Sequence, residues 1–141
     1  MMSIRMMKKM SITTARVVSS SASLILGVGV TVTTVQCAAG VLVQKCACTT
    51  LDIQGGTVTT YGVGAITTIT MDAGAASLLA SGTITTLTLA GGTCDFLGSG
   101  VARTVTTLVH NGGTLRQDSG VLTITTYTKK TGPAQIVASD P

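Results

Sequence analysis

The sequence predicts an all-β fold, a single-stranded parallel β-helix (β-solenoid) of about seven coils with a period near 18–19 residues. A Thr-Thr pair follows an apolar residue in every coil, and successive pairs of this register lie 16 to 21 residues apart. One further pair, Thr59-Thr60 after Val58, lies outside the register. Stacked repeats of this length bury an apolar face that a single repeat cannot bury alone. The apolar residues that start the repeats are Ile12, Val32, Cys48, Ile66, Ile84, Val105 and Ile124.

Two further positions agree with this alignment, although neither was used to build it. Three residues after each start the chain carries an apolar or aromatic side chain: Ala15, Val35, Leu51, Ile69, Leu87, Leu108 and Tyr127. Eight residues after the start it carries glycine, with Ser20 as the one exception: Gly40, Gly56, Gly74, Gly92, Gly113 and Gly132. Because glycine tolerates positive φ and close backbone approach, this position predicts a tight corner in each coil.

A second turn signal closes several coils, so each unit is expected to run strand, corner, shorter strand, corner. These signals are Gly62-Val-Gly64, Ser81-Gly82, Ser99-Gly100 and Ser119-Gly120. The side chains expected to point inward include Leu51, Ile69, Leu87 and Leu108. Strict alternation would point Ile84 outward with Thr86 and Thr88, whereas a corner at the Thr-Thr pair would turn Ile84 inward. The sequence leaves both orientations open.

The chain is expected to form one domain with distinct ends. Residues 12–132 are assigned to the solenoid, residues 1–11 to a basic, Met-rich N-terminal tail or cap, and residues 133–141 to a C-terminal cap or tail. A signal peptide is an alternative for the first 30 residues, with residues 24–30 as its apolar part. At the C-terminal end, Lys129, Lys130 and Pro133 are residue types that discourage pairing at a sheet edge.

The residues that could carry chemistry do not fall into a pattern that supports catalysis. Cys46 and Cys48 are too close for the usual zinc-ligand spacing, and the four cysteines fit small buried residues better than a disulfide or a metal site. His110 takes a slot that is apolar in most coils. The sequence therefore predicts no enzyme and no catalytic, cofactor or metal site. Cys37 and Cys94 have no partner at a metal-ligand spacing. Asp52, Asp72, Asp95 and Asp118 occupy different positions in their coils, so they do not stack into an acidic column.

Charge and hydropathy also restrict the partners. Four of the nine basic residues lie within the first 16 positions. The other five are balanced by the five Asp, so the rest of the chain has no net charge. Clustered cations and stacking aromatics are lacking, with aromatics at 2% of the chain, which excludes a nucleic-acid interface on the solenoid. No stretch reaches the ~18 uninterrupted apolar residues of a membrane span.

One surface feature is a candidate binding face. If strands alternate, paired threonines form outward ranks like those of ice-binding solenoids. The second rank is interrupted by Arg16, Gln36, Asp52 and Val109. The threonines that form the ranks are Thr68, Thr70, Thr86, Thr88, Thr126 and Thr128.

From Cys48 to the C-terminus the repeat resembles that of β-helical bacteriophage virion proteins, which are head-associated and decoration-like. The resembling stretches are Ile84-TTLTLAGGTCDFLGSG, Val105-TTLVHNGGTLRQDSG and Leu122-TITTYTKKTGPAQIVASDP. The resemblance implies a rigid structural protein of the virion, present in many copies or as a homo-oligomer and bound to capsid or tail proteins. Alternatives are a passenger fragment of a surface adhesin or other secreted β-solenoid, which would be extracellular or at the cell surface, and an ice-binding solenoid.

Overall fold

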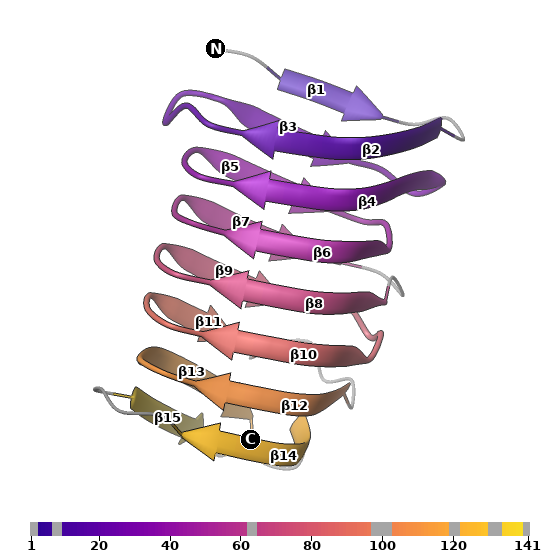
Figure 1. Ribbon diagram of the computed structural model, residues 1–141. Coiled ribbons are helices and arrows are strands. Elements are labelled where there is room, and N and C mark those ends of the chain that lie inside the picture. Colours follow the sequence, from indigo (N-terminus) through magenta and orange to yellow (C-terminus); the bar gives the residue numbers. More distant parts are fainter. Residues whose placement is uncertain are drawn as a thin grey trace.

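The chain folds as a parallel β-solenoid whose coils stack along one axis (Figure 1). The structure is a computed structural model that describes residues 3–6, 10–61, 65–96, 103–118, 122–129 and 134–139. The regular elements among these residues are all strands, as the sequence predicted. They are β1 (Ser3–Met6), β2 (Met10–Val17), β3 (Ser23–Leu26), β4 (Val30–Cys37), β5 (Val41–Gln44), β6 (Cys48–Ile53), β7 (Thr57–Thr60), β8 (Ile66–Met71), β9 (Ala75–Leu78), β10 (Ile84–Leu89), β11 (Thr93–Asp95), β12 (Arg103–His110), β13 (Gly113–Asp118), β14 (Leu122–Lys129) and β15 (Ala134–Ser139).

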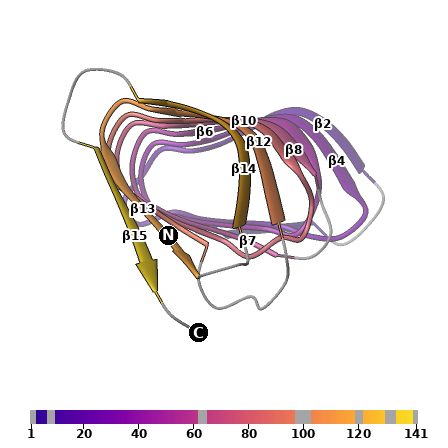
Figure 2. The same ribbon diagram turned by 90° about the horizontal axis from the view of Figure 1, so that it is seen from below.

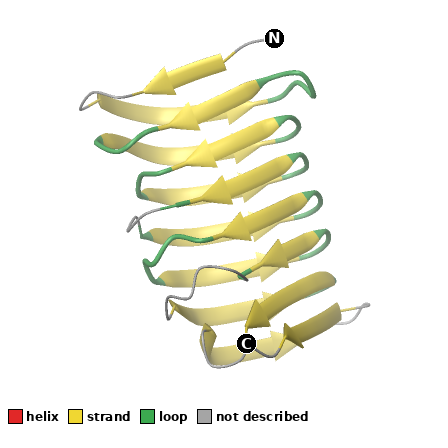
Figure 3. Ribbon diagram, turned by 180° about the vertical axis from the view of Figure 1, so that it is seen from behind, coloured by secondary structure: helices red, strands yellow, loops and turns green. Residues whose placement is uncertain are grey.

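The strands form two parallel sheets. The even-numbered strands make a seven-stranded sheet in the order β14-β12-β10-β8-β6-β4-β2, and the odd-numbered strands make an eight-stranded sheet from β1 to β15. Seen along the axis, the two sheets face each other across one interior (Figure 2). Figure 3 shows the corners that join them on both sides of the stack. The solenoid has about six turns, close to the seven coils expected.

The Thr-Thr pair is a bend within each long strand. In β10, Ile84 and Thr86 pair with both neighbouring strands, whereas Thr85 has no partner in either ladder. The chain turns at Thr85, which is exposed, and Ile84 on the near side of the bend is buried. Ile84 therefore points inward, and the bend explains why strict alternation fails at this point.

The core consists of in-register columns of apolar side chains. Leu51, Ile69, Leu87 and Leu108 are fully buried, which confirms the expected inward set. Each pairs with the equivalent residue of the next coil, so every coil covers the apolar side of its neighbour. Truncating one such leucine to alanine would cost about 2–5 kcal/mol, because the fixed ladder allows little collapse into the cavity.

The glycine position forms a tight corner. Its glycines have positive φ values between 74° and 87°: Gly40, Gly56, Gly74, Gly92 and Gly113. A Cβ atom at Gly74 would lie 2.6 Å from the carbonyl oxygen of Gly56, the corner glycine one coil away. Both the dihedral angle and the stacking distance therefore require glycine here.

The first and last coils differ at this corner. Ala22, and not Ser20, is equivalent to Gly40, because Val41 donates its backbone N–H to Ala22 O at 3.0 Å. Two extra residues in the first corner shift the register, which explains the missing glycine at Ser20. In the last coil Gly113 pairs with Ala134, and Gly132 lies outside the described residues.

Strands continue the eight-stranded sheet into both predicted end segments. β1 lies within the expected N-terminal tail or cap and pairs with β3, and β15 lies within the expected C-terminal one and pairs with β13. Lys129 ends β14 and is exposed. Several turn signals and end residues lie outside the described residues: Gly62, Gly64, Ser99, Gly100, Ser119, Gly120, Lys130 and Pro133.

Replacing Gly74 by alanine should destabilise the protein by about 1–3 kcal/mol, because the new methyl group strains the backbone and meets the Gly56 carbonyl. Urea unfolding followed by circular dichroism measures this loss. Thr67→Ala in the same coil removes an exposed side chain and should change stability by less than about 0.5 kcal/mol. Equal effects of the two substitutions would contradict the corner geometry.

Candidate functional site

The six threonines of the predicted binding face lie on the outer surface of the seven-stranded sheet. Thr68 pairs with Thr86, and Thr70 pairs with Thr88, in adjacent strands. These four side chains are partly exposed and alternate with buried residues of β8 and β10. Thr126 and Thr128 are exposed on β14, separated from β10 by β12. We call these six residues the threonine face.

The rank that contains Thr68, Thr86 and Thr126 continues beyond the threonine face along the whole sheet. Each long strand contributes an in-register threonine: Thr14, Thr34, Thr50, Thr68, Thr86, Thr107 and Thr126. The second rank is mixed, since Gln36 pairs with Asp52 and donates to its Oδ2 at 3.4 Å. Val109 stands between Thr88 and Thr128 in the same rank. The outer surface of the seven-stranded sheet therefore carries one continuous threonine column beside an interrupted one.

All four cysteines are free thiols in the interior, as the residue pattern favoured. Cys37, Cys48 and Cys94 occupy inward strand positions, and Cys46 is buried in the corner after β5. Burial raises the pKa of the Cys48 thiol to about 11 and that of Cys94 to about 12. At neutral pH these thiols are protonated, which makes them weak nucleophiles.

Gln44 forms a buried polar contact beside two of these thiols. Its Nε2 donates to the carbonyl oxygen of Cys46 at 2.9 Å and contacts Cys48 Sγ at 3.2 Å. Thr60, which pairs with Gln44 in the next coil, is also buried. These contacts hold the chain where it leaves β5, so the cluster stabilises a corner.

His110 is fully buried at the end of β12, in the column that it was expected to share with apolar residues. Its Nδ1 lies 3.2 Å from the Tyr127 hydroxyl, and its Nε2 lies 3.3 Å from the carbonyl oxygen of Gly113. Both ring nitrogens therefore have partners within the fold. The Tyr127 ring meets the imidazole edge-on, with centroids 6.0 Å apart.

The three Asp side chains that the structure describes, those of Asp52, Asp72 and Asp95, do not converge. Asp52 accepts from Gln54 Nε2 at 2.9 Å, and Asp95 lies 3.6 Å from the Arg116 guanidinium. Asp72 is exposed near the glycine corner. Within the described part of the chain, no three His, Cys, Asp or Glu side chains are grouped so that they could hold a metal ion.

Arg103 is an unexpected buried cation at the start of β12. Its guanidinium donates to the carbonyl oxygen of Phe96 and lies 5.0 Å from the centroid of the Phe96 ring. Phe96 is itself fully buried. The attraction between a cation and an aromatic ring offsets part of the cost of burying the charge. The pair links the end of one coil to the start of the next.

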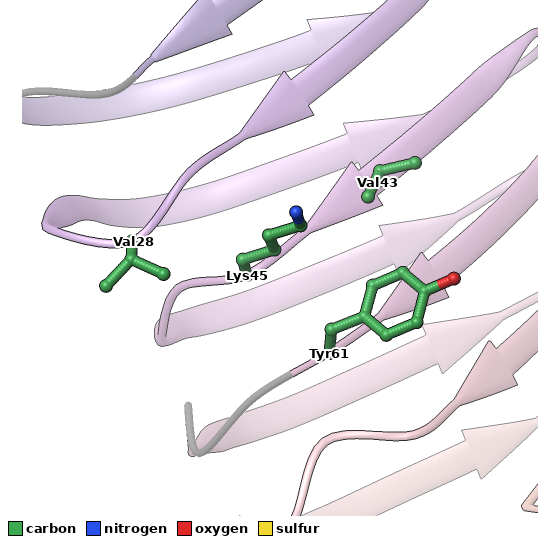
Figure 4. A pocket seen from close by; sticks show the side chains of 4 residues that line it. All are labelled: Val28, Val43, Lys45 and Tyr61. Carbon is green, nitrogen blue, oxygen red and sulfur yellow. The ribbon is translucent and has the colours of Figure 1, made fainter. Parts of the chain in front are cut away.

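A shallow hollow of about 490 Å³ lies at the corner that follows the short strands, beside β5 (Figure 4). Val28, Val43, Lys45 and Tyr61 line it, and we refer to the space between these four side chains as the hollow. Lys45 stands between Val28 and Tyr61 along the stack, and Val43 flanks them (Figure 4). The hollow combines one cation and one phenol with two apolar side chains.

The repeat pattern of the sequence does not predict the hollow, because three of its four residues lie in corners outside the repeated positions. A signal was present in the short strands, since β3 and β5 contain three consecutive apolar residues each, Leu24–Leu26 and Val41–Val43. In a parallel sheet such runs indicate strands that are apolar on both faces. β7 alternates instead, with Val58 buried between Thr57 and Thr59.

Comparisons with protein families, with curated proteins and with solved structures found no match. The described residues contain no helix that is long and apolar enough to cross a membrane.

The four thiols should resist modification by a disulfide reagent at pH 8 in the folded protein and react when it is unfolded. Because folding raises the pKa of Cys48 and Cys94 from 9.0, the unfolded chain loses thiol protons first as the pH rises. The free energy of unfolding should therefore be unaffected by these groups below about pH 8 and fall between about pH 9 and 12. Rapid modification of native protein at pH 8 would contradict their burial.

Proposed function

We propose that the chain is a non-enzymatic structural protein of a virion, a rigid β-solenoid attached in many copies to capsid or tail proteins. The observation that carries the proposal is the continuity of the backbone ladders, which join every long strand from β2 to β14 and every short strand from β1 to β15. A stack held in register over its whole length resists bending, and stiffness is what a passive structural component needs.

The placement of the reactive side chains supports this role. The cysteines and His110 lie in the interior, where they pack and hydrogen-bond within the fold. The outer surface of the seven-stranded sheet carries mostly threonine. A wettable, nearly uncharged face of this kind suits the exposed side of a particle or a contact with a regular protein lattice.

The direct test is cryo-electron microscopy of particles from the source that encodes this chain. We expect density for a two-sheet solenoid on the capsid or tail, repeated at equivalent positions of the lattice. Particles whose density is completely accounted for by other proteins would overturn the virion proposal. The adhesin alternative would then take first place, and a cleaved N-terminus with large flanking domains in the full gene would support it.

The register of the threonine face keeps an ice-binding solenoid as a second candidate. Thr68 and Thr70 pair directly with Thr86 and Thr88, so hydroxyl and methyl groups repeat at about the 4.8 Å strand spacing. Asp52 and Gln36 interrupt the second rank further along. We expect no thermal hysteresis from the purified chain. Hysteresis that Thr86→Lys abolishes would favour ice binding over the virion role.

A further inference from the structure

We propose that the hollow is the docking point of the solenoid, and that it receives an apolar side chain flanked by a carboxylate on the surface of a partner protein. The inference deepens the proposed function, on which it rests only in taking that partner to be a capsid or tail protein. It places the attachment at the corner where the short strands of the eight-stranded sheet end, away from the threonine face of the seven-stranded sheet.

The backbone holds the lining residues in fixed positions. Lys45 donates its N–H to Leu26 O, and Tyr61 donates its N–H to Gln44 O, both at 2.8 Å. The side chains of Lys45 and Tyr61 therefore lie one coil apart on a continuing ladder. Two of the four residues that line the hollow are therefore held by the coil-to-coil ladder.

Val28 is presented by a tight turn. The Val30 N–H donates to Gly27 O at 3.4 Å, and Gly29 has a φ of 90°, as position i+2 of a type II turn requires. Val28 occupies the preceding position and is 75% exposed. The geometry of such a turn does not require a β-branched apolar residue at its tip. We therefore assign the exposed Val28 side chain to contact with the partner protein.

The outer face next to the hollow is apolar. Ile25 and Val43 form an in-register pair on β3 and β5, and Val41 beside them is 43% exposed. Both strands thus carry apolar residues toward solvent as well as toward the core. Parallel strands with this pattern are usually covered on both faces, and exposed apolar patches rimmed by polar groups mark interaction sites.

Charge defines the complementary group. β3, β5, β7 and the corners after β3 and β5 contain no Asp or Glu, whereas Lys45 lies within the hollow and is exposed. The Asp on the short strand β11, Asp95, is engaged with Arg116 and is separated from β7 by β9. Within these described elements, a partner carboxylate would therefore meet Lys45 without competition from an acid of the same strands or corners.

These observations favour a protein partner over two other occupants. Small-ligand sites bury about 70–90% of their ligand, but Tyr61 and Val28 are 42% and 75% exposed and form an open surface. A second copy docked face to face would bring two Lys45 amines together in an apolar contact with no carboxylate between them. An anchor side chain from a larger surface satisfies both the shape and the charge.

The first experiment uses 1-anilinonaphthalene-8-sulfonate, which joins an apolar ring system to an anion, as a soluble mimic of the anchor. We expect its addition to shift the backbone NMR signals of Val28, Val43, Lys45 and Tyr61. Lys45→Met should weaken its binding by roughly two- to fivefold, the effect of losing one partly exposed ion pair. Lys129→Met, which removes an exposed lysine on β14, is the matched control and should leave binding unchanged.

Val28→Ser supplies an independent variant, because a change at an exposed turn tip should leave the fold intact and still weaken binding. Circular dichroism of each variant checks the fold. Signal shifts centred elsewhere, or equal effects of Lys45→Met and Lys129→Met, would overturn the proposal. A concentration-dependent dimer in analytical ultracentrifugation that Lys45→Met strengthens would also overturn it, in favour of self-association.

A second experiment separates this inference from the proposed function. The full chain is added to particles lacking it, and sedimentation measures how much binds. Binding that Val43→Asp abolishes and Thr88→Lys leaves intact supports both statements. Binding lost only with Thr88→Lys supports the virion role and overturns docking through the hollow. No binding by the wild-type chain counts against the virion role, and the solution experiment then decides on the hollow alone.

Discussion

The coil-to-coil hydrogen bonds at the glycine corner are the interaction on which the remaining structure depends. The backbone N–H groups of Thr57, Ala75 and Thr93 each donate to a corner glycine of the preceding coil, at 2.9 to 3.0 Å. Through these bonds the ladder passes from the long strands into the short ones without a break. The inward columns, the threonine ranks and the hollow all inherit their register from it, and a Cβ atom at the corner would force the coils apart.

Much of the fold was predictable because the repeated positions are occupied by residue types with strict conformational or burial requirements. A tight corner at Gly56 and Gly92 can be anticipated because glycine recurs at the same position of the coil. The inward position of Leu87 follows from apolar residues that recur once per coil. The orientation of Ile84 was not predictable, because a bend at Thr85 and a straight strand have the same sequence pattern. The shift from Ser20 to Ala22 depends on two extra residues, which only pairing reveals.

The surface was harder to predict than the core. The threonine ranks follow from the repeat itself, whereas the hollow draws Val28, Lys45 and Tyr61 from corners of different length. The ladder fixes the backbone at Lys45 and Tyr61, but core packing does not determine which side chains these exposed corner positions carry. The chain thus has two dissimilar outer surfaces, a polar threonine sheet and an apolar, cationic corner region. This asymmetry would give a rod a defined orientation on a lattice.

Amide hydrogen exchange followed by NMR tests most directly whether the ladder continues through the glycine corner. The account predicts that the corner amides of Thr57, Ala75 and Thr93 are protected to the same degree as strand amides such as Leu87, since all open only when the stack unfolds. Exchange of the three corner amides at the rate of an exposed loop, with strand amides still protected, would contradict it. The two sheets would then be joined by flexible turns, and the rigid register assumed for both outer surfaces would be lost.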